Sequence, residues 1–237
     1  MNNLEQLLDR LCNYLPKPAV DAALEQLGGL SGRPSGARTP CPRRCPELSP
    51  CRPVPGQGSR RSRLVILGEA PGTDEDAIGH PFVGQSGLLL TAALNSLGVD
   101  RNRVFITNVV RCRPPNNREP HSAEQEACRQ LLKDELTGLP SGVVVLTLGN
   151  VPLRFMRGTS GPGVTACRGV WLESFRWQRS LVAAVIPTYH PAFVLRRLDG
   201  DILDQFVRDI REAVGLALAL RWPAFLSAYY HSGLSGS

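Results

Sequence analysis

The sequence predicts an α/β fold, a three-layer α/β/α sandwich around a central, mainly parallel, four-stranded sheet. Two observations support this prediction. Short apolar runs alternate along the chain with longer segments of helical periodicity, the order that places helices on both faces of a parallel sheet. Each apolar run also ends in a turn rich in glycine, proline or polar residues. In such sheets the ligand crevice lies at the carboxyl ends of the strands.

Four segments are predicted as strands because their apolar runs are short and bounded by turns. They are "LVIL" at 64–67, "RVFITNVV" at 103–110, "GVVVLTLG" at 142–149 and "SLVAAVIPT" at 180–188.

Five segments are predicted as helices. The first has leucines at helical spacing over 4–15, and a weaker one follows at 18–27. The third, at 86–99, ends at Gly98, which is typical of the glycine just past a helix. The last two are "HSAEQEACRQLLKDEL" at 121–136 and "DILDQFVRDIREAVGLALAL" at 201–220.

The segment at 28–63 is dense in Gly, Pro, Ser and Arg. Such a segment cannot bury a core of its own, so we expect a linker that becomes ordered only if its cysteines are held. The 237 residues suit one domain with appendages. We therefore predict an N-terminal helix and linker at 1–40, the main domain at 41–222 and a tail at 223–237.

Composition limits the function classes. No apolar run approaches the ~18 residues of a membrane span, and the N-terminus lacks the features of a secretory signal, so a cytoplasmic protein without a membrane partner is expected. Of the 27 basic residues all but two are arginine, and the net charge is +6, which favours a nucleic-acid partner modestly. The seven cysteines then favour metal or cluster ligation over disulfides.

Three unusual polar loops follow predicted strands and should converge at one edge of the sheet. They are "GEAPGTDEDAIGHPFVG" at 68–84, "NVVRCRPPNNREP" at 108–120 and "YHP" at 189–191. Each alone has an ordinary explanation: a tight turn, an asparagine that caps a turn, or a structural histidine. None has the spacing of a nucleotide-binding loop.

Taken together, in order and spacing, these loops resemble the family-four uracil-DNA glycosylases, the iron–sulfur branch of that superfamily. The resemblance runs from about residue 41 to residue 197. It implies hydrolysis of the N-glycosidic bond of flipped-out deoxyuridine, in single- or double-stranded DNA, to free uracil and an abasic site in base-excision repair. It also implies a monomer without a nucleotide cofactor.

The resemblance assigns roles to residues in these loops. Phe82 would stack on uracil, Asn108 would read its O4 and N3–H, and His190 would donate to O2 as negative charge builds there. The carboxylate that orients water is Glu69 or Glu75, with Asp74 and Asp76 behind them; we prefer Glu69 narrowly. The alternative for either is a carboxylate bound to backbone N–H groups of its own turn. The pocket wall would be the backbone of Gly68, Ala70, Pro71 and Gly72.

The segment after His190 is expected to contact DNA. In the superfamily the matching loop enters the minor groove, so Val194 or Leu195 is the predicted wedge, and Arg196 and Arg197 would hold phosphates. The alternative is an ordinary helix start with Leu195 packed inward.

The resemblance also implies a [4Fe–4S] cluster held by four cysteines. Cys112 and Cys128 match the family's two later cluster ligands. Cys45 begins the segment "CPEL", which resembles the segment at the family's second ligand, so Cys45 matches that ligand. Cys41 is then the fourth ligand, one residue further away than the usual CxxC spacing, with Cys51 in reserve. Zn²⁺ would suit the same thiolates if the resemblance were ignored. Cys12 and Cys167 are expected to be ordinary thiols.

Two other functions remain open from the sequence. One is a non-catalytic iron–sulfur protein that binds DNA or uracil. The other is a glycosylase with a shifted base specificity.

Overall fold

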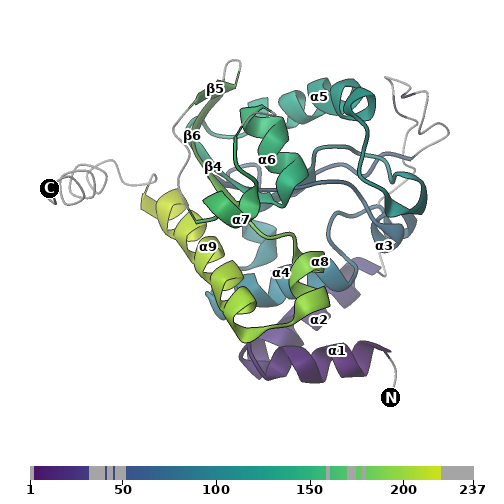
Figure 1. Ribbon diagram of the computed structural model, residues 1–237, viewed down its shortest axis with the longest axis vertical. Helices are drawn as coiled ribbons and strands as arrows, with labels where there is room; N and C mark the ends of the chain where they lie inside the picture. Colours follow the sequence, from purple (N-terminus) through teal and green to yellow (C-terminus); the bar gives the residue numbers. More distant parts are fainter. Residues whose placement is uncertain are drawn as a thin grey trace, which may run out of the picture.

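The computed structural model describes residues 3–31, 41, 45, 52–158, 161–169, 175–177 and 180–219. Its centre is a sheet with the strand order β1-β3-β2-β4-β6-β5, flanked by helices (Figure 1). The four inner strands are the predicted ones and run parallel to one another. They are β3 (Phe105–Asn108), β2 (Leu64–Gly68), β4 (Val143–Leu148) and β6 (Ser180–Thr188).

The predicted number of four strands was too small, because two short antiparallel strands extend the sheet at its edges. β1 (Gln57–Gly58) pairs with β3, and β5 (Phe175–Trp177) pairs with β6. A two-residue strand inside a Gly- and Pro-rich segment has no periodicity to detect. The fold class itself is confirmed.

All five predicted helices are present. They are α1 (Asn3–Cys12), α2 (Lys17–Ser31), α4 (Gln85–Ser96), α5 (Ser122–Thr137) and α9 (Gly200–Ala219). The predicted role of Gly98 at the end of α4 is confirmed. Gly98 has a left-handed φ of 72°, and the backbone N–H groups of Gly98 and Val99 donate to Asn95 and Leu94, which is the Schellman pattern.

The structure adds short helices beyond the five predicted, although a helix start after His190 was noted from sequence as an alternative. They are α3 (Thr73–Ile78), α6 (Asn150–Arg157), α7 (Val164–Cys167) and α8 (Pro191–Arg197), with 3₁₀ turns η2 (Arg101–Arg103) and η3 (Pro115–Asn117). None is longer than 8 residues, so their periodicity is too brief to read. In the described part of the chain, no helix has the length and apolar character needed to cross a bilayer.

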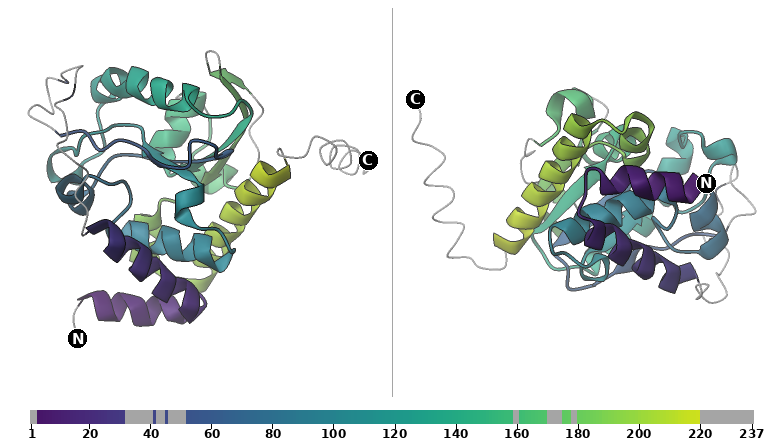
Figure 2. Two further views of the ribbon diagram at one scale, coloured as in Figure 1. Left: turned by 180° about the vertical axis from the view of Figure 1, so that it is seen from behind. Right: turned by 90° about the horizontal axis from the view of Figure 1, so that it is seen from below.

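The two faces of the sheet are covered by different helices (Figures 1 and 2). Along β2, Leu64 and Ile66 belong to one apolar cluster, and Val65 and Leu67 belong to the other. This alternation is the period of two expected of a strand that is buried on both sides. The first cluster contains residues of α1, α2, α4, α8 and α9, and the second contains residues of α5 and α6.

The N-terminal helices share the core of the domain. Leu7, Leu11 and Leu15 are buried in the same cluster as strand β2, and the Tyr14 hydroxyl donates to the Leu198 carbonyl at 3.4 Å. Residues 3–31 are thus an integral layer, although they precede the region of resemblance. The domain boundary at 41 stays a prediction, and the tail at 223–237 lies outside the described residues.

Removing the buried side chain of Leu11 tests whether α1 is integral. Leu11 is 0% exposed, so Leu11→Ala should lower the free energy of unfolding by about 2–5 kcal/mol through lost burial and a cavity. Chemical denaturation followed by circular dichroism measures this. Leu4→Ala is the matched control, because Leu4 lies on the same helix and is 42% exposed. If the two variants were equally stable, α1 would not contribute to the core.

Candidate active site

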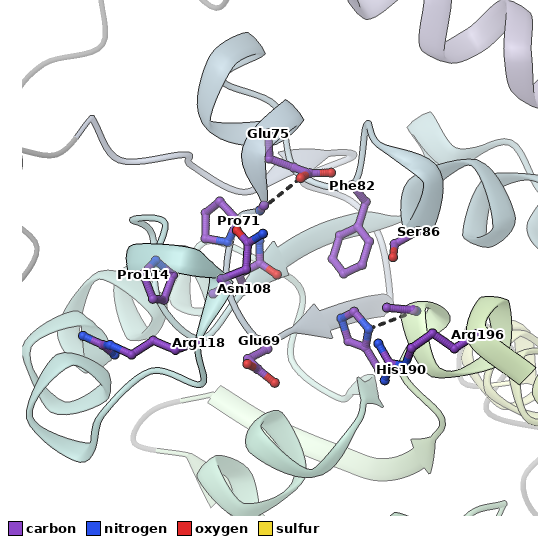
Figure 3. A pocket seen from close by; sticks show the side chains of 14 residues that line it. Glu69, Pro71, Glu75, Phe82, Ser86, Asn108, Pro114, Arg118, His190 and Arg196 are labelled. Atoms are coloured by element: carbon purple, nitrogen blue, oxygen red, sulfur yellow. Dashed lines mark hydrogen bonds between the residues drawn. The ribbon is translucent and has the colours of Figure 1, made fainter. Parts of the chain in front are cut away.

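A pocket lies at the carboxyl edge of the parallel sheet, where the three polar loops were expected to converge (Figure 3). Strand register brings them together: Gly68 at the end of β2 pairs with Asn108 at the end of β3, and Thr188 of β6 pairs with Leu148 of β4. The cavity has a volume of about 480 Å³. The predicted site residues that line it are Glu69, Ala70, Pro71, Gly72, Glu75, Phe82, Asn108, His190 and Arg196.

The first loop is folded around the carboxylate of Glu75. Its two oxygens accept hydrogen bonds from the backbone N–H groups of Gly72 at 3.0 Å, Val83 at 2.8 Å and Gly84 at 2.9 Å. Charge-assisted bonds of this kind are strong and fix both ends of the loop. The Glu75 carboxylate therefore holds the loop, as in the alternative noted for it from sequence.

A buried arginine holds the other side of this loop. The Arg101 guanidinium donates to the carbonyls of Pro81 at 3.0 Å and Phe82 at 2.9 Å, and to the Thr91 hydroxyl at 3.0 Å. Phe82 has a φ of 53°, which a bulky residue adopts only where its surroundings impose it. Its ring faces the pocket, 6.3 Å from the imidazole of His190. Sequence reasoning missed Arg101, because nothing marks it among the other arginines.

Asn108 presents an unused hydrogen-bond acceptor to the pocket. Its side chain is 1% exposed, and Oδ1 has no partner among the described residues. A buried acceptor without a partner is costly, so its presence points to a ligand with an N–H group. The lack of a side chain at Gly68 makes room, because a Cβ there would lie 2.3 Å from Oδ1 and 2.4 Å from the Phe82 ring.

The backbone of Asn108 is held by the fully buried Arg111. Its guanidinium donates to the Asn108 carbonyl and, at 2.7 Å, to Glu135. The same Glu135 carboxylate accepts from the Thr107 hydroxyl at 2.8 Å. This ion pair, in which Arg111 is buried and Glu135 partly exposed, fixes the end of β3 and therefore the position of the Asn108 amide.

His190 is positioned as a neutral hydrogen-bond donor. It is the N-cap of α8, and its Nδ1 accepts from the backbone N–H of Ala192 at 3.1 Å (Figure 3). The proton of the neutral ring therefore sits on Nε2. Burial, with a smaller contribution from Arg196, lowers the pKa of His190 to about 4, so the ring is uncharged at neutral pH.

Burial favours the uncharged form of Glu69 as well. Burial raises the pKa of Glu69 to about 7, with Glu119 acting in the same direction and Arg154 opposing it. Glu119 and Arg154 form an ion pair at 2.6 Å. A carboxyl group that titrates near neutrality inside a pocket is typical of a residue that exchanges a proton with water or substrate.

Several residues of the pocket were not predicted from sequence. They are Ser86, Pro114, Asn117, Arg118 and Ala192. All five lie within or next to the loops already singled out, so proximity was the available signal. Arg118 forms a bidentate ion pair with the buried Glu124 at 2.6 and 2.8 Å, which fixes the far wall of the pocket at the start of α5.

The segment predicted to contact DNA is helix α8. Val194 is 0% exposed and Leu195 packs partly against the same core cluster. Val194 therefore cannot enter a groove while α8 is folded, and Leu195 follows the inward-packed alternative. Arg196 and Arg197 are exposed, and Arg196 also lines the pocket.

The cysteines gather beside the loop that follows Asn108. Cys45 and Cys112 are buried against each other. Burial raises the pKa of the Cys128 thiol, and the neighbouring Cys41 and Cys45 act in the same direction. Cys51, the reserve ligand, lies outside the described residues. Cys45 and Cys112 thus pack together, and Cys41 and Cys128 lie in the same part of the fold.

Four thiolates suit either a single Zn²⁺ ion or a [4Fe–4S] cluster. Among the residues that the structure describes, no three Cys, His, Asp or Glu side chains lie close enough to hold a single metal ion. A [4Fe–4S] cluster takes four cysteine thiolates, and Cys41, Cys45, Cys112 and Cys128 supply that donor set.

Comparison with known proteins shows the family of this chain. Residues 55–213 match the family model described as the uracil DNA glycosylase superfamily. A type-4 uracil-DNA glycosylase of Thermotoga maritima is 38% identical over 170 residues, covering 71% of this chain and 85% of the relative. One from Archaeoglobus fulgidus is 42% identical, covering 61% and 72%. A type-5 uracil-DNA glycosylase of Mycobacterium bovis is 33% identical, covering 70% and 68%.

The family match covers the whole of the parallel sheet and all three loops of the pocket. The type-4 relatives are 36% to 42% identical to this chain, above the 33% of the type-5 relative. The chain therefore belongs to the uracil DNA glycosylase superfamily and, within it, to the type-4 family.

Proposed function

We propose that this protein is a monofunctional uracil-DNA glycosylase that hydrolyses the N-glycosidic bond of flipped-out deoxyuridine in base-excision repair. The observation that carries the proposal is the unpaired, buried Oδ1 of Asn108, in a pocket that also holds Phe82 and the neutral imidazole of His190. The cavity of about 480 Å³ is of the size usual for small-molecule sites, about 300–1,000 Å³.

These groups match the edge of uracil. Oδ1 of Asn108 would accept the N3–H of uracil, which cytosine lacks, and the amide nitrogen would donate to O4. Phe82 would supply the stacking surface for the base. Because each group is already held by backbone bonds or buried charges, the pocket needs little reorganisation on binding.

The same groups support the reaction. Cleavage of the bond between N1 and the sugar C1′ leaves the electron pair on uracil and positive charge on the sugar. Nε2–H of His190 would stabilise the charge on O2, and a neutral donor does so without protonating the base. Ionised Glu69 would orient the water that adds to C1′ and take up its proton. The described lining of the pocket includes no lysine, so hydrolysis without a Schiff base, and hence without strand cleavage, is expected.

We also propose that Cys41, Cys45, Cys112 and Cys128 hold a [4Fe–4S] cluster when their thiols are reduced, with Cys51 as the alternative to Cys41. The support is the chemistry of the donor set: Cys45, Cys112 and Cys128 are buried, and Cys41 lies near them. The cluster would supply a structural crosslink between the linker and the sheet, outside the reaction. We further propose that the protein is a monomer and acts in the cytoplasm, where thiols stay reduced.

Uracil release tests the function directly. The protein is incubated with single- and double-stranded oligonucleotides that contain one deoxyuridine. Free uracil should appear, and strands should break only after alkali treatment. Strands that survive alkali would contradict the proposal, and tight binding without turnover would favour the non-catalytic alternative. Release of another base in place of uracil would indicate shifted specificity.

Substitutions of the two base-reading residues test their roles. Asn108→Asp and His190→Ala should each lower single-turnover uracil release by about 10²–10³-fold, the usual effect of losing a preorganised hydrogen bond to developing charge. Asn102→Asp is the control, because it makes the same chemical change at an exposed position. Rates within about tenfold of the parent, or ~1.4 kcal/mol of barrier, would refute the assignment.

The pH dependence of uracil release tests Glu69. Because the pKa of Glu69 is raised to about 7, its ionised fraction grows as the pH rises through 7, and the rate should rise with it. His190 has a pKa of about 4 and does not titrate between pH 5 and pH 9. Glu69→Gln should therefore be slow and should lose the rise. A parent profile that is flat across this range would argue against Glu69.

The cysteine site is tested by anaerobic purification. The protein should be brown, absorb visible light and contain iron, and Cys45→Ser, Cys112→Ser and Cys128→Ser should each lose the colour. Cys12→Ser is the control, since Cys12 is exposed. Comparing Cys41→Ser with Cys51→Ser identifies the fourth ligand. A colourless protein that contains zinc would overturn the cluster proposal and leave the glycosylase proposal standing.

A further inference from the structure

A row of aromatic and cationic side chains lies beside the pocket and is not used by the reaction. The rings of Tyr189 and Phe193 are 5.0 Å apart and tilted by 32°. The Arg168 guanidinium lies 5.4 Å from the centre of the Tyr189 ring, and that of Arg197 lies 5.5 Å from the centre of the Phe193 ring. The order along the row is therefore Arg168, Tyr189, Phe193 and Arg197.

Phe193 differs from the two apolar residues that follow it on α8. Val194 is fully buried and Leu195 packs against the core. Phe193 is only partly buried, and it belongs to none of the apolar clusters formed by the described residues. Phe193 is thus a large apolar side chain of α8 that does not pack into the described core.

The row is fixed at its inner end. Arg168 forms a bidentate ion pair with the buried Asp209, at 3.0 and 3.2 Å, and the Tyr189 hydroxyl is 3.2 Å from Gln205 of α9. Tyr189 therefore has little freedom to move. Phe193 rests on a rigid neighbour, which lowers the entropy cost of stacking another ring on it.

The row is continuous with the base pocket and carries charge suited to DNA. Ala192 and Arg196, on the same short helix as Phe193, line the pocket, and Tyr189 immediately precedes His190. Arg196 and Arg197 are exposed, and guanidinium groups bind phosphates in a bidentate manner. A strand whose uracil entered the pocket would pass over this helix.

We propose that Phe193 is a stacking platform for the base next to the flipped deoxyuridine on the same strand, with Arg197 on the adjoining phosphate. The inference rests on the proposed function, because a uracil bound in the pocket sets the path of the DNA strand over α8. It replaces Val194 and Leu195 as the apolar contact of α8 with DNA. Stacking on an aromatic face does not depend on base identity, so the platform adds affinity without adding a sequence preference.

Binding is measured without turnover, so that a failure of the stacking platform can be distinguished from a failure of the glycosylase proposal. The probe is a single-stranded oligonucleotide with a tetrahydrofuran abasic analogue flanked on one side by 2-aminopurine, prepared in both polarities. Stacking should quench 2-aminopurine on binding to the parent protein in one polarity. Phe193→Ala should abolish the quench and weaken binding by about 5- to 150-fold, while Phe193→Tyr should keep both. Leu195→Ala is the matched control and should behave as the parent.

Several outcomes would overturn the platform. A lower melting temperature of Phe193→Ala, with affinity within twofold of the parent and the quench intact, would mean that the row only stabilises α8. Loss of the quench in Leu195→Ala alone would restore the wedge at Leu195. If the parent released no uracil but Phe193→Ala still lost the quench, the platform would stand and the glycosylase proposal would fall.

Discussion

The parallel pairing of the four inner strands is the constraint on which the site depends. Parallel strands present all their carboxyl ends at one edge of the sheet. Register then sets the spacing: Gly68 lies opposite Asn108, and Leu148 lies opposite Thr188, two residues before His190. Three loops that are far apart in sequence thereby surround one cavity. A shift of register between β2 and β3 would move the Asn108 amide away from the Phe82 ring.

Buried charges then hold each loop in place. Glu75 and Arg101 hold the first loop from its two sides, Arg111 holds the end of β3, and Asp209 accepts from the Thr188 hydroxyl at the end of β6. Buried ionic groups are costly unless they are well paired, and these groups are bonded to backbone or to one another. Their common effect is a preorganised site, the arrangement that stabilises charge most effectively.

The cysteine site and the base-reading amide are parts of one segment. Arg111 connects them, because its guanidinium holds the Asn108 carbonyl while its backbone hydrogen-bonds to Cys128. Cys112 is the next residue. A centre that fixes Cys112 and Cys128 would therefore also restrain the loop that orients Asn108, although it takes no part in the chemistry. Burial of the pocket also keeps His190 neutral and raises the pKa of Glu69 to about 7.

The sequence by itself determined the parallel sheet, the long helices and the three loops, because periodicity and turn chemistry are local properties that a single chain displays. The resemblance of these loops to the family-four uracil-DNA glycosylases then pointed to Phe82, Asn108 and His190 as candidate site residues. Only the tertiary structure separated Glu69 from Glu75, because the two carboxylates differ in their hydrogen-bond partners and burial, not in residue type. Likewise, only the structure shows that Val194 is fully buried and that Phe193 is partly exposed. Such distinctions arise from packing between elements distant in the chain, and no local pattern encodes them.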